Sequence, residues 1–184
     1  MNPETLIKTE NIILQRGGTI VLDIPEFHVR QGRVQALIGP NGAGKSTLLL
    51  ILAGLLKPQQ VKVYFQGKPL ENRADLAMLR RNVAVVFQEP LLLNSSVFEN
   101  VALGLKFRKI KNEEIRKSVQ SALDYFGISQ LTKRSAKTLS GGEAKRVSLA
   151  RAFAIKPLII LLDEAFNSLD PPSRETIIDD LKRL

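Results

Sequence analysis

The stretch that decides the fold of this chain is Gly39-Pro40-Asn41-Gly42-Ala43-Gly44-Lys45-Ser46-Thr47. It fits the pattern G-x-x-x-x-G-K-[ST], whose glycines let backbone N–H groups converge on phosphate oxygens. Apolar residues 34–38 precede it and apolar residues 48–52 follow it, so we expect a short buried strand, the loop and a buried helix. The stretch therefore predicts a loop that binds a nucleoside triphosphate.

Each residue type in this loop has a chemical reason to be there. The positive end of the following helix adds to the field of the loop amides. Lys45 is expected to reach the β- and γ-phosphates, and the Ser46 hydroxyl to ligate Mg²⁺. A dinucleotide fingerprint does not fit, because Thr47 stands where that pattern needs a third glycine. The simpler alternative is a glycine-rich turn before a core helix.

Length and composition limit the class of protein. The 184 residues suit one compact domain with subdomains, and the absence of cysteine excludes disulfides and thiolate metal sites. No apolar run approaches the roughly 20 residues of a membrane-spanning helix. The net charge of +9 is compatible with a solvated face near a membrane or a nucleotide, with plain surface, or with nucleic-acid binding. Two tyrosines and no tryptophan leave little for base stacking, so nucleic acid is not the expected partner.

The pattern of apolar residues predicts an α/β protein. Strands are expected at residues 6–14, 20–29, 61–66 and 82–87, the first two joined through Gly17 and Gly18. Residues 115–126 have helical spacing and stop at Gly127, and a last helix is expected at 173–184. Residues 158–162 form an uninterrupted apolar run, which is typical of a strand covered on both faces in a parallel sheet.

An acidic pair ends that apolar strand. Asp163 and Glu164 stand at its carboxyl end, where ligands bind in open α/β sheets. Asp163 suits a metal ligand, and Glu164 suits the group that orients or deprotonates an attacking water. The alternative interpretation is that the acidic pair only begins a solvated loop. The presence of a phosphate loop in the same chain favours the functional interpretation.

A second helix start carries the features of an anion site. Ser140 and Glu143 fit a capping box, and Gly141 and Gly142 bare backbone N–H groups in the first turn of the helix that follows. One nucleotide needs only one such site, so this one is either spare or a simple helix cap.

Taken together, these motifs resemble the ATP-binding domain of the ABC transporter family. The loop at 39–47 is similar to the family's Walker A loop, Gln88 to its Q-loop, and residues 139–143 to its signature motif. Residues 158–163 resemble the Walker B strand and 168–170 the D-loop, in family order over residues 5–184. The resemblance implies a P-loop NTPase core with a mostly parallel sheet, an N-terminal antiparallel β subdomain and a helical subdomain.

The resemblance also implies where these parts and their ligands lie. The antiparallel subdomain would comprise 1–36 and 60–70, the catalytic core 37–59, 71–90 and 146–184, and the helical subdomain 91–145. Two copies would join head to tail, with each ATP and its Mg²⁺ between the phosphate loop of one copy and Ser140, Gly141 and Gly142 of the other. Asp170 would contact the nucleotide. Gln88 would sense the metal and the attacking water.

Further partners and departures follow from the same likeness. The helical subdomain would dock on transmembrane permease subunits at the cytoplasmic face of the membrane, and residues 87–101 resemble importer ATPases for oxyanions such as tungstate, molybdate or phosphate. Arg16 stands where the family has an aromatic residue that stacks on adenine, and its guanidinium plane can stack instead. The family's switch histidine would lie beyond Leu184, so we expect a C-terminally truncated core. A non-catalytic nucleotide-binding fragment and a soluble ATPase of nucleic-acid metabolism are the alternatives.

Overall fold

The computed structural model describes residues 4–166, 171 and 175. These residues belong to two compact units, Met1–Arg81 with Glu175–Leu184, and Asn82–Arg174. No helix in the described part of the chain has the length and apolar character needed to cross a membrane. The predicted D-loop residue Asp170 lies outside the described residues, as does the predicted helix 173–184 apart from Glu175.

The first unit is built on an antiparallel sheet with the strand order β2-β1-β3-β4. Its strands are β1 (Thr5–Arg16), β2 (Thr19–Arg30), β3 (Gln60–Phe65) and β4 (Lys68–Pro69). Gly17 and Gly18 join β1 to β2 with φ angles of 56° and 81°, as a tight turn with two left-handed residues requires. The strands predicted at 6–14, 20–29 and 61–66 are confirmed.

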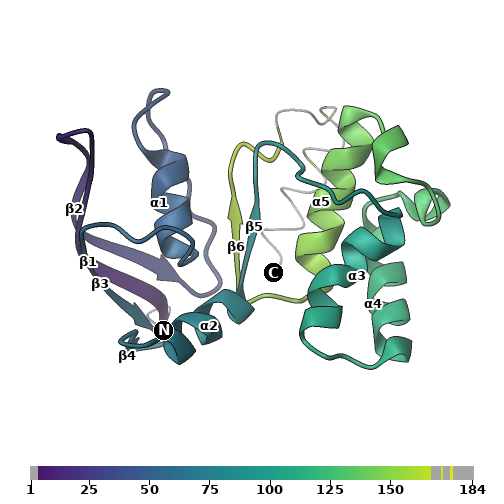
Figure 1. Cartoon of the computed structure of the whole chain (residues 1–184), viewed down its shortest axis with the longest axis horizontal. Coiled ribbons are helices and arrows are strands. Elements are labelled where there is room, and N and C mark those ends of the chain that lie inside the picture. Colours follow the sequence, from purple (N-terminus) through teal and green to yellow (C-terminus); the bar gives the residue numbers. More distant parts are fainter. Residues whose placement is uncertain (1–3, 167–170, 172–174, 176–184) are drawn as a thin grey trace. The chain divides into compact units, whose positions relative to one another are not determined.

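Within residues 4–82, two helices accompany this sheet. They are α1 (Lys45–Leu52) and α2 (Arg73–Asn82), and Figure 1 shows α1 beside the sheet. Helix α1 buries Leu48, Ile51 and Leu52, which confirms the helix predicted after the phosphate loop. Its end is held by Arg80 of α2, whose Nε donates to the Gly54 carbonyl at 3.0 Å.

The segment before the phosphate loop is not the buried strand that the sequence predicts. Residues 33–38 form no strand, and Val34 and Ile38 are 69% and 94% exposed. A strand exists only where its main chain pairs with a neighbour, and no described strand pairs with this segment. Instead, the Gln35 side chain accepts a hydrogen bond from the Arg30 amide and donates one to the His28 carbonyl.

Between residues 82 and 166, the second unit combines a parallel strand pair with three packed helices. Strands β5 (Val83–Val86) and β6 (Ile159–Leu162) run in register, which confirms parallel pairing of the two predicted strands. The prediction that β6 is covered on both faces is wrong in degree. Ile159 and Leu161 on one face are buried, whereas Ile160 and Leu162 on the other face are only half-buried.

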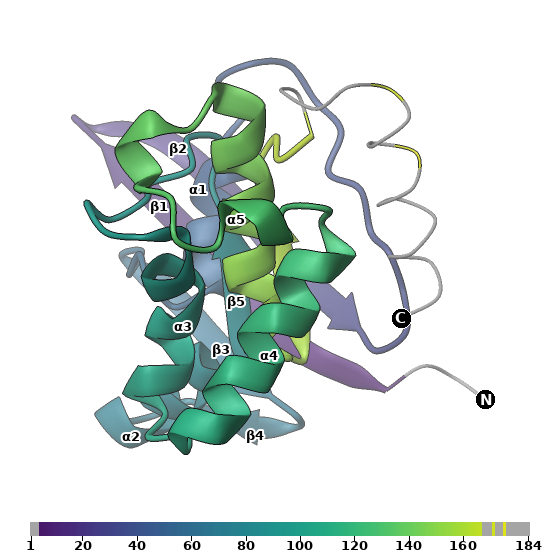
Figure 2. The same cartoon turned by 90° about the vertical axis from the view of Figure 1, so that its right-hand side faces the viewer.

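The helices of this unit lie side by side, as Figures 1 and 2 both show. They are α3 (Val97–Phe107), α4 (Asn112–Tyr125) and α5 (Gly141–Ala154), with the short turns η1 (Ser129–Leu131) and η2 (Ala136–Thr138) before α5. Their common core includes Val101, Val119, Leu123 and Leu149, each at most 1% exposed. Helix α4 ends before Gly127, whose φ is 64°, as the sequence predicts.

Candidate functional site

The phosphate loop in the first unit has the backbone geometry that its glycines make possible. Gly42 and Gly44 have φ angles of 81° and 83°, in the left-handed region that glycine adopts without strain. A Cβ on Gly44 would lie 2.5 Å from Leu22 Cδ2, so the helix start packs directly on β2. Gly44 is also the N-cap of α1, which places the amides of the loop at the positive end of that helix.

The Lys45 side chain reaches back across this loop. Its Nζ donates to the carbonyl oxygens of Gly39 and Pro40, each at 2.8 Å. The ammonium therefore lies at the start of the loop although its Cα is in the first turn of α1. A triphosphate lying on the loop amides would meet this positive charge.

The other candidate residues of the first unit are distributed around the loop and the hairpin. Pro40, Asn41, Gly42, Ala43 and Ser46 are exposed, and Gly44, Lys45 and Thr47 are half-buried. Arg16 ends β1 and is exposed opposite Thr19. No hydrogen bond or ion pair among the described residues joins Arg16 to the loop, so its adenine contact stays a prediction.

Three candidate residues of the second unit follow the carboxyl ends of its two strands. Val86 and Leu162 are partners in register at the carboxyl ends of β5 and β6, and the Asp163 amide donates to the Val86 carbonyl at 2.9 Å. The chain segments that carry Gln88 on one strand and Asp163 and Glu164 on the other are thus neighbours. Gln88 and Glu164 are exposed, Asp163 is half-buried, and Glu164 has a φ of 48°.

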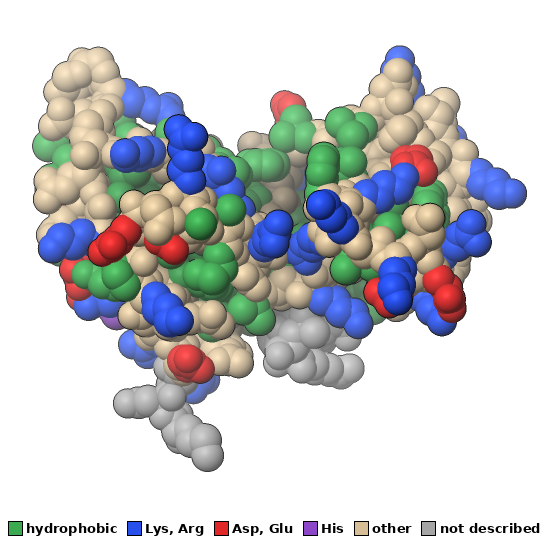
Figure 3. Space-filling view, turned by 60° about the horizontal axis from the view of Figure 1, so that its bottom comes forward, with side chains coloured by type: hydrophobic (Ala, Val, Ile, Leu, Met, Phe, Trp, Pro, Cys, Tyr) green, Lys and Arg blue, Asp and Glu red, His purple; other side chains and the backbone are tan. Residues whose placement is uncertain are grey.

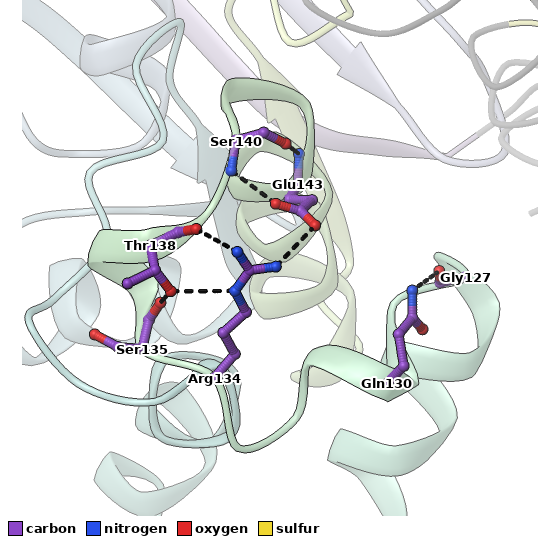
Figure 4. A network of polar contacts seen from close by, with 7 residues as sticks. All are labelled: Gly127, Gln130, Arg134, Ser135, Thr138, Ser140 and Glu143. Carbon is purple, nitrogen blue, oxygen red and sulfur yellow. Dashed lines mark hydrogen bonds and ion pairs between the residues drawn. The ribbon is translucent and has the colours of Figure 1, made fainter.

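The predicted capping box is present at the start of α5 (Figure 4). The Glu143 amide donates to Ser140 Oγ at 3.3 Å, and the Ser140 amide donates to Glu143 Oε2 at 2.7 Å. The hydrogen bond from the Ser140 amide is the largest of the effects that lower the pKa of Glu143. With Ser140 and Gly141 exposed, the first turn of the helix faces solvent.

Arg134 supports this helix start, although no pattern in the sequence singles it out. Its Nη1 lies 3.4 Å from Glu143 Oε1, while its Nε and Nη2 donate to the Thr138 hydroxyl and carbonyl (Figure 4). The guanidinium therefore connects the turn before the signature to the carboxylate of the capping box.

Two more residues of α5 were missed by the sequence reasoning. Lys145 is 1% exposed and donates to main-chain oxygens of Phe87 and Gln88. Arg151 donates to the main-chain oxygens of Pro90 and Leu91. Burial lowers the pKa of Lys145, and the negative charges of Asp163 and Glu164 oppose that shift. The available signal was a lysine at helical spacing from the apolar Leu149 and Ala152.

Each unit carries oxygen atoms of the kind that bind magnesium. Mg²⁺ prefers oxygen ligands and is usually held by one or two carboxylates together with substrate phosphates. In the second unit the Asp163 carboxylate and the Gln88 amide offer such oxygens, and in the first unit the Ser46 hydroxyl offers another. The described residues hold no group of three or more His, Cys, Asp or Glu placed to bind a metal by themselves.

Comparison with known proteins identifies related sequences. The family model described as ABC transporter matches residues 22–167. The tungstate uptake system ATP-binding protein TupC of Peptoclostridium acidaminophilum is 42% identical over 93% of this chain and 77% of its own length. The molybdate/tungstate import ATP-binding protein WtpC of Thermococcus kodakarensis is 41% identical over 88% of this chain, which spans only half of that relative.

Solved structures agree with the sequence matches. The cbiO1 protein of Clostridium perfringens, described as part of the ABC transporter complex cbiONQ, has a TM-score of 0.83 and 34% identity, covering 98% of this chain and 73% of its own. A dimeric ATP-binding cassette in a post-hydrolysis state, bound to ADP and Pi, has a TM-score of 0.88 and 31% identity, covering 97% and 82% of the two chains.

Proposed function

This chain belongs to the ABC transporter family as an ATP-binding domain with the P-loop NTPase fold, and we propose that it hydrolyses ATP between two copies to power import of an inorganic oxyanion. The observation that carries the proposal is the 42% identity to a tungstate uptake ATPase over nearly the whole chain. Membership of the family supports the ATPase reaction. The identity of the cargo as an oxyanion is the more specific part of the proposal.

Different residues would bind the phosphates, hold the metal ion and activate the attacking water. The loop amides and Lys45 would bind the β- and γ-phosphates, with the Ser46 hydroxyl beside them. Bound Mg²⁺ neutralises charge on the phosphates, and Asp163, Gln88 and Ser46 would hold it. Glu164 would orient the attacking water and accept its proton, because its carboxylate follows the carboxyl end of β6, where ligands bind in open α/β sheets.

The signature turn would act on a second copy of the chain. Gly141 and Gly142 have amides in the first turn of α5, next to Ser140, whose own amide bonds to Glu143. One nucleotide held on the phosphate loop does not need this second helix start. In a head-to-tail pair each turn would meet the γ-phosphate held by the partner's loop, with Asp170 nearby. The solved relative that is a dimer with ADP and Pi supports this arrangement.

The choice of cargo rests on the relatives' names. Two relatives are tungstate or molybdate/tungstate import ATPases, and another imports sulfate or thiosulfate by name. Others are named for spermidine/putrescine or Fe(3+) import. In this proposal the domain lies at the cytoplasmic face of the membrane against transmembrane permease subunits, and those subunits select the cargo.

Two substitutions test the ATPase half of the proposal. Lys45→Ala should weaken ATP affinity by about 100-fold, since it removes a charge-assisted contact of the kind worth roughly 1.5–3 kcal/mol. Glu164→Gln should keep ATP affinity and slow turnover by at least about 100-fold. Calorimetric titration with ATP and steady-state phosphate release measure the two effects.

Matched controls sharpen this test. Lys57→Ala and Glu71→Gln change exposed residues of the same types and should leave binding and turnover unchanged. Wild-type turnover in Glu164→Gln would remove Glu164 from the proposed catalytic role. Wild-type affinity in Lys45→Ala would remove the phosphate-loop assignment.

The cargo half needs the membrane partner. The chain would be purified with a permease that binds it and reconstituted in liposomes. ATP turnover would then be measured with tungstate, molybdate, sulfate or spermidine and a binding protein for each. Stimulation by an oxyanion and not by spermidine is expected. Stimulation by spermidine alone would replace oxyanion import with polyamine import.

A further inference from the structure

Four main-chain oxygens of one loop segment are held by two side chains of α5. Lys145 Nζ donates to the carbonyls of Phe87 and Gln88 at 2.7 and 2.8 Å. Arg151 Nη2 and Nη1 donate to the carbonyls of Pro90 and Leu91, each at 3.0 Å. Residues 87–91 therefore lie along α5 without forming a strand or helix of their own.

Lys145 is not an ordinary surface lysine whose stem covers apolar groups. It is 1% exposed, and an ammonium taken out of water is costly unless hydrogen bonds compensate. A leucine would fill similar space without that cost. What the ammonium adds is a pair of bonds to two adjacent carbonyls, which fixes the path of the chain at Gln88.

The surroundings of the ammonium support a role at the carboxyl edge of the strands. Asp163 and Glu164 interact electrostatically with Lys145, and the Asp163 segment is paired to the end of β5. The lysine thus bonds to the Gln88 segment and is close enough to the acidic pair to interact with its charge. Arg151 extends the attachment to the end of the segment, where Leu91 has a φ of 44°.

We propose that Lys145 is the positioning residue for Gln88. Together, Lys145 and Arg151 bind residues 87–91 to α5, so that this loop moves when the helix moves. Because α5 begins at the signature turn, a shift of that turn is passed to the Gln88 loop of the same copy. This inference rests on the proposed function for its consequence in catalysis, since it assumes that Gln88 acts on the attacking water and that Ser140 meets the partner's nucleotide.

Hydrogen exchange on the full chain tests the attachment directly. Lys145→Met keeps the length and apolar stem of the side chain and removes its donors, and Lys145→Gln restores one N–H donor group without the charge. Lys133→Met is the matched control, because Lys133 is exposed and lies outside the attachment. Exchange of the amides in 87–93 should rise at least tenfold in Lys145→Met, less in Lys145→Gln and not at all in Lys133→Met.

Kinetics of the same variants separate positioning from plain stabilisation. In Lys145→Met, kcat for ATP hydrolysis should fall at least tenfold while KM for ATP changes less than about twofold, and Lys145→Gln should recover part of the loss. This split is expected because the loop at 39–47, which would bind the triphosphate, lies in the other unit.

Three results would overturn the inference. The first is unchanged exchange at 87–93 in Lys145→Met. The second is a rise spread evenly over α3, α4 and α5, which would make Lys145 a general stabiliser of the unit. The third is increased exchange at 87–93 with wild-type kcat. A parent chain that binds no ATP would instead refute the proposed function, and the exchange experiment would still decide whether the attachment exists.

Discussion

At the scale of single residues, the buried polar side chains differ in how their polar atoms are satisfied. Asn100 is fully buried, and its amide group bonds to the main chain of Leu93 and Ser96 and to the Ser95 hydroxyl. It therefore holds the turn before α3 in one shape. Thr9 is equally buried, yet its Oγ1 has no hydrogen-bond partner among the described residues. A buried hydroxyl without a partner destabilises the fold by its desolvation.

Replacing that hydroxyl should stabilise the chain. Thr9→Val keeps the shape and the preference for a strand, so the free energy of unfolding should rise by about 1 kcal/mol. Urea denaturation followed by circular dichroism measures it. Thr19→Val, at an exposed strand position, should stay within about 0.5 kcal/mol of the parent. A loss of stability in Thr9→Val would mean that the hydroxyl holds a buried water.

At the scale of elements, the helix starts carry most of the candidate chemistry. Helix α1 begins at a glycine in the left-handed region, and α5 begins at a capping box. Both ends expose N–H groups that the helix itself cannot satisfy. The sequence predicted both starts, because caps depend on residues within one turn of each other.

The start of α1 permits a comparison between two glycines of the same loop. Gly44→Ala should destabilise the chain by about 2–4 kcal/mol, because positive φ and a Cβ 2.5 Å from Leu22 Cδ2 both oppose it. Gly42→Ala has the same φ problem with no atom within 4 Å, so about 1 kcal/mol is expected. Thermal and urea unfolding give both values. Equal losses would show that Leu22 moves aside without cost.

The start of α5 should make stability depend on pH through Glu143. The folded-state pKa of Glu143 lies below its ordinary value of 4.5, chiefly because the Ser140 amide bonds the carboxylate. Its stabilising contribution is therefore complete above pH 4.5 and is lost as the pH falls through the folded-state value. Glu143→Gln should lower stability most at neutral pH, and the difference from the parent should disappear in acid. Unfolding curves across this pH range, with Glu71→Gln as an exposed control, check it. If the difference in stability between Glu143→Gln and the parent did not change with pH, the charge of Glu143 would not be its cause.

At the scale of the whole molecule, charge and assembly are the relevant properties. On the face drawn in Figure 3, Lys and Arg side chains stand singly or in small groups with Asp and Glu among them. The basic side chains on this face are thus interspersed with acidic and uncharged ones. The proposed partners are a second copy and permease subunits, and the second copy can be tested with the chain alone.

Dimer formation should depend on the signature turn. In a Glu164→Gln background with ATP, the chain is expected to elute as a dimer in gel filtration, and adding Ser140→Arg should leave it monomeric with ATP affinity intact. The added side chain would occupy the place of the partner's γ-phosphate. Ser121→Arg, on the exposed side of α4, should leave the dimer unchanged. If Ser140→Arg abolished ATP binding by the monomer, the turn would serve its own copy.

The sequence by itself determined the features that neighbouring residues decide: the phosphate loop, the tight turn at Gly17, the capping box at Ser140 and the end of α4 at Gly127. Each depends on backbone freedom or on hydrogen bonds within a few residues. Tertiary structure alone decided that residues 33–38 form no strand, since a strand needs a partner from elsewhere in the chain. It also decided that Lys145 is buried against Phe87 and Gln88, because only folding brings an ammonium to carbonyls that lie 57 and 58 residues away.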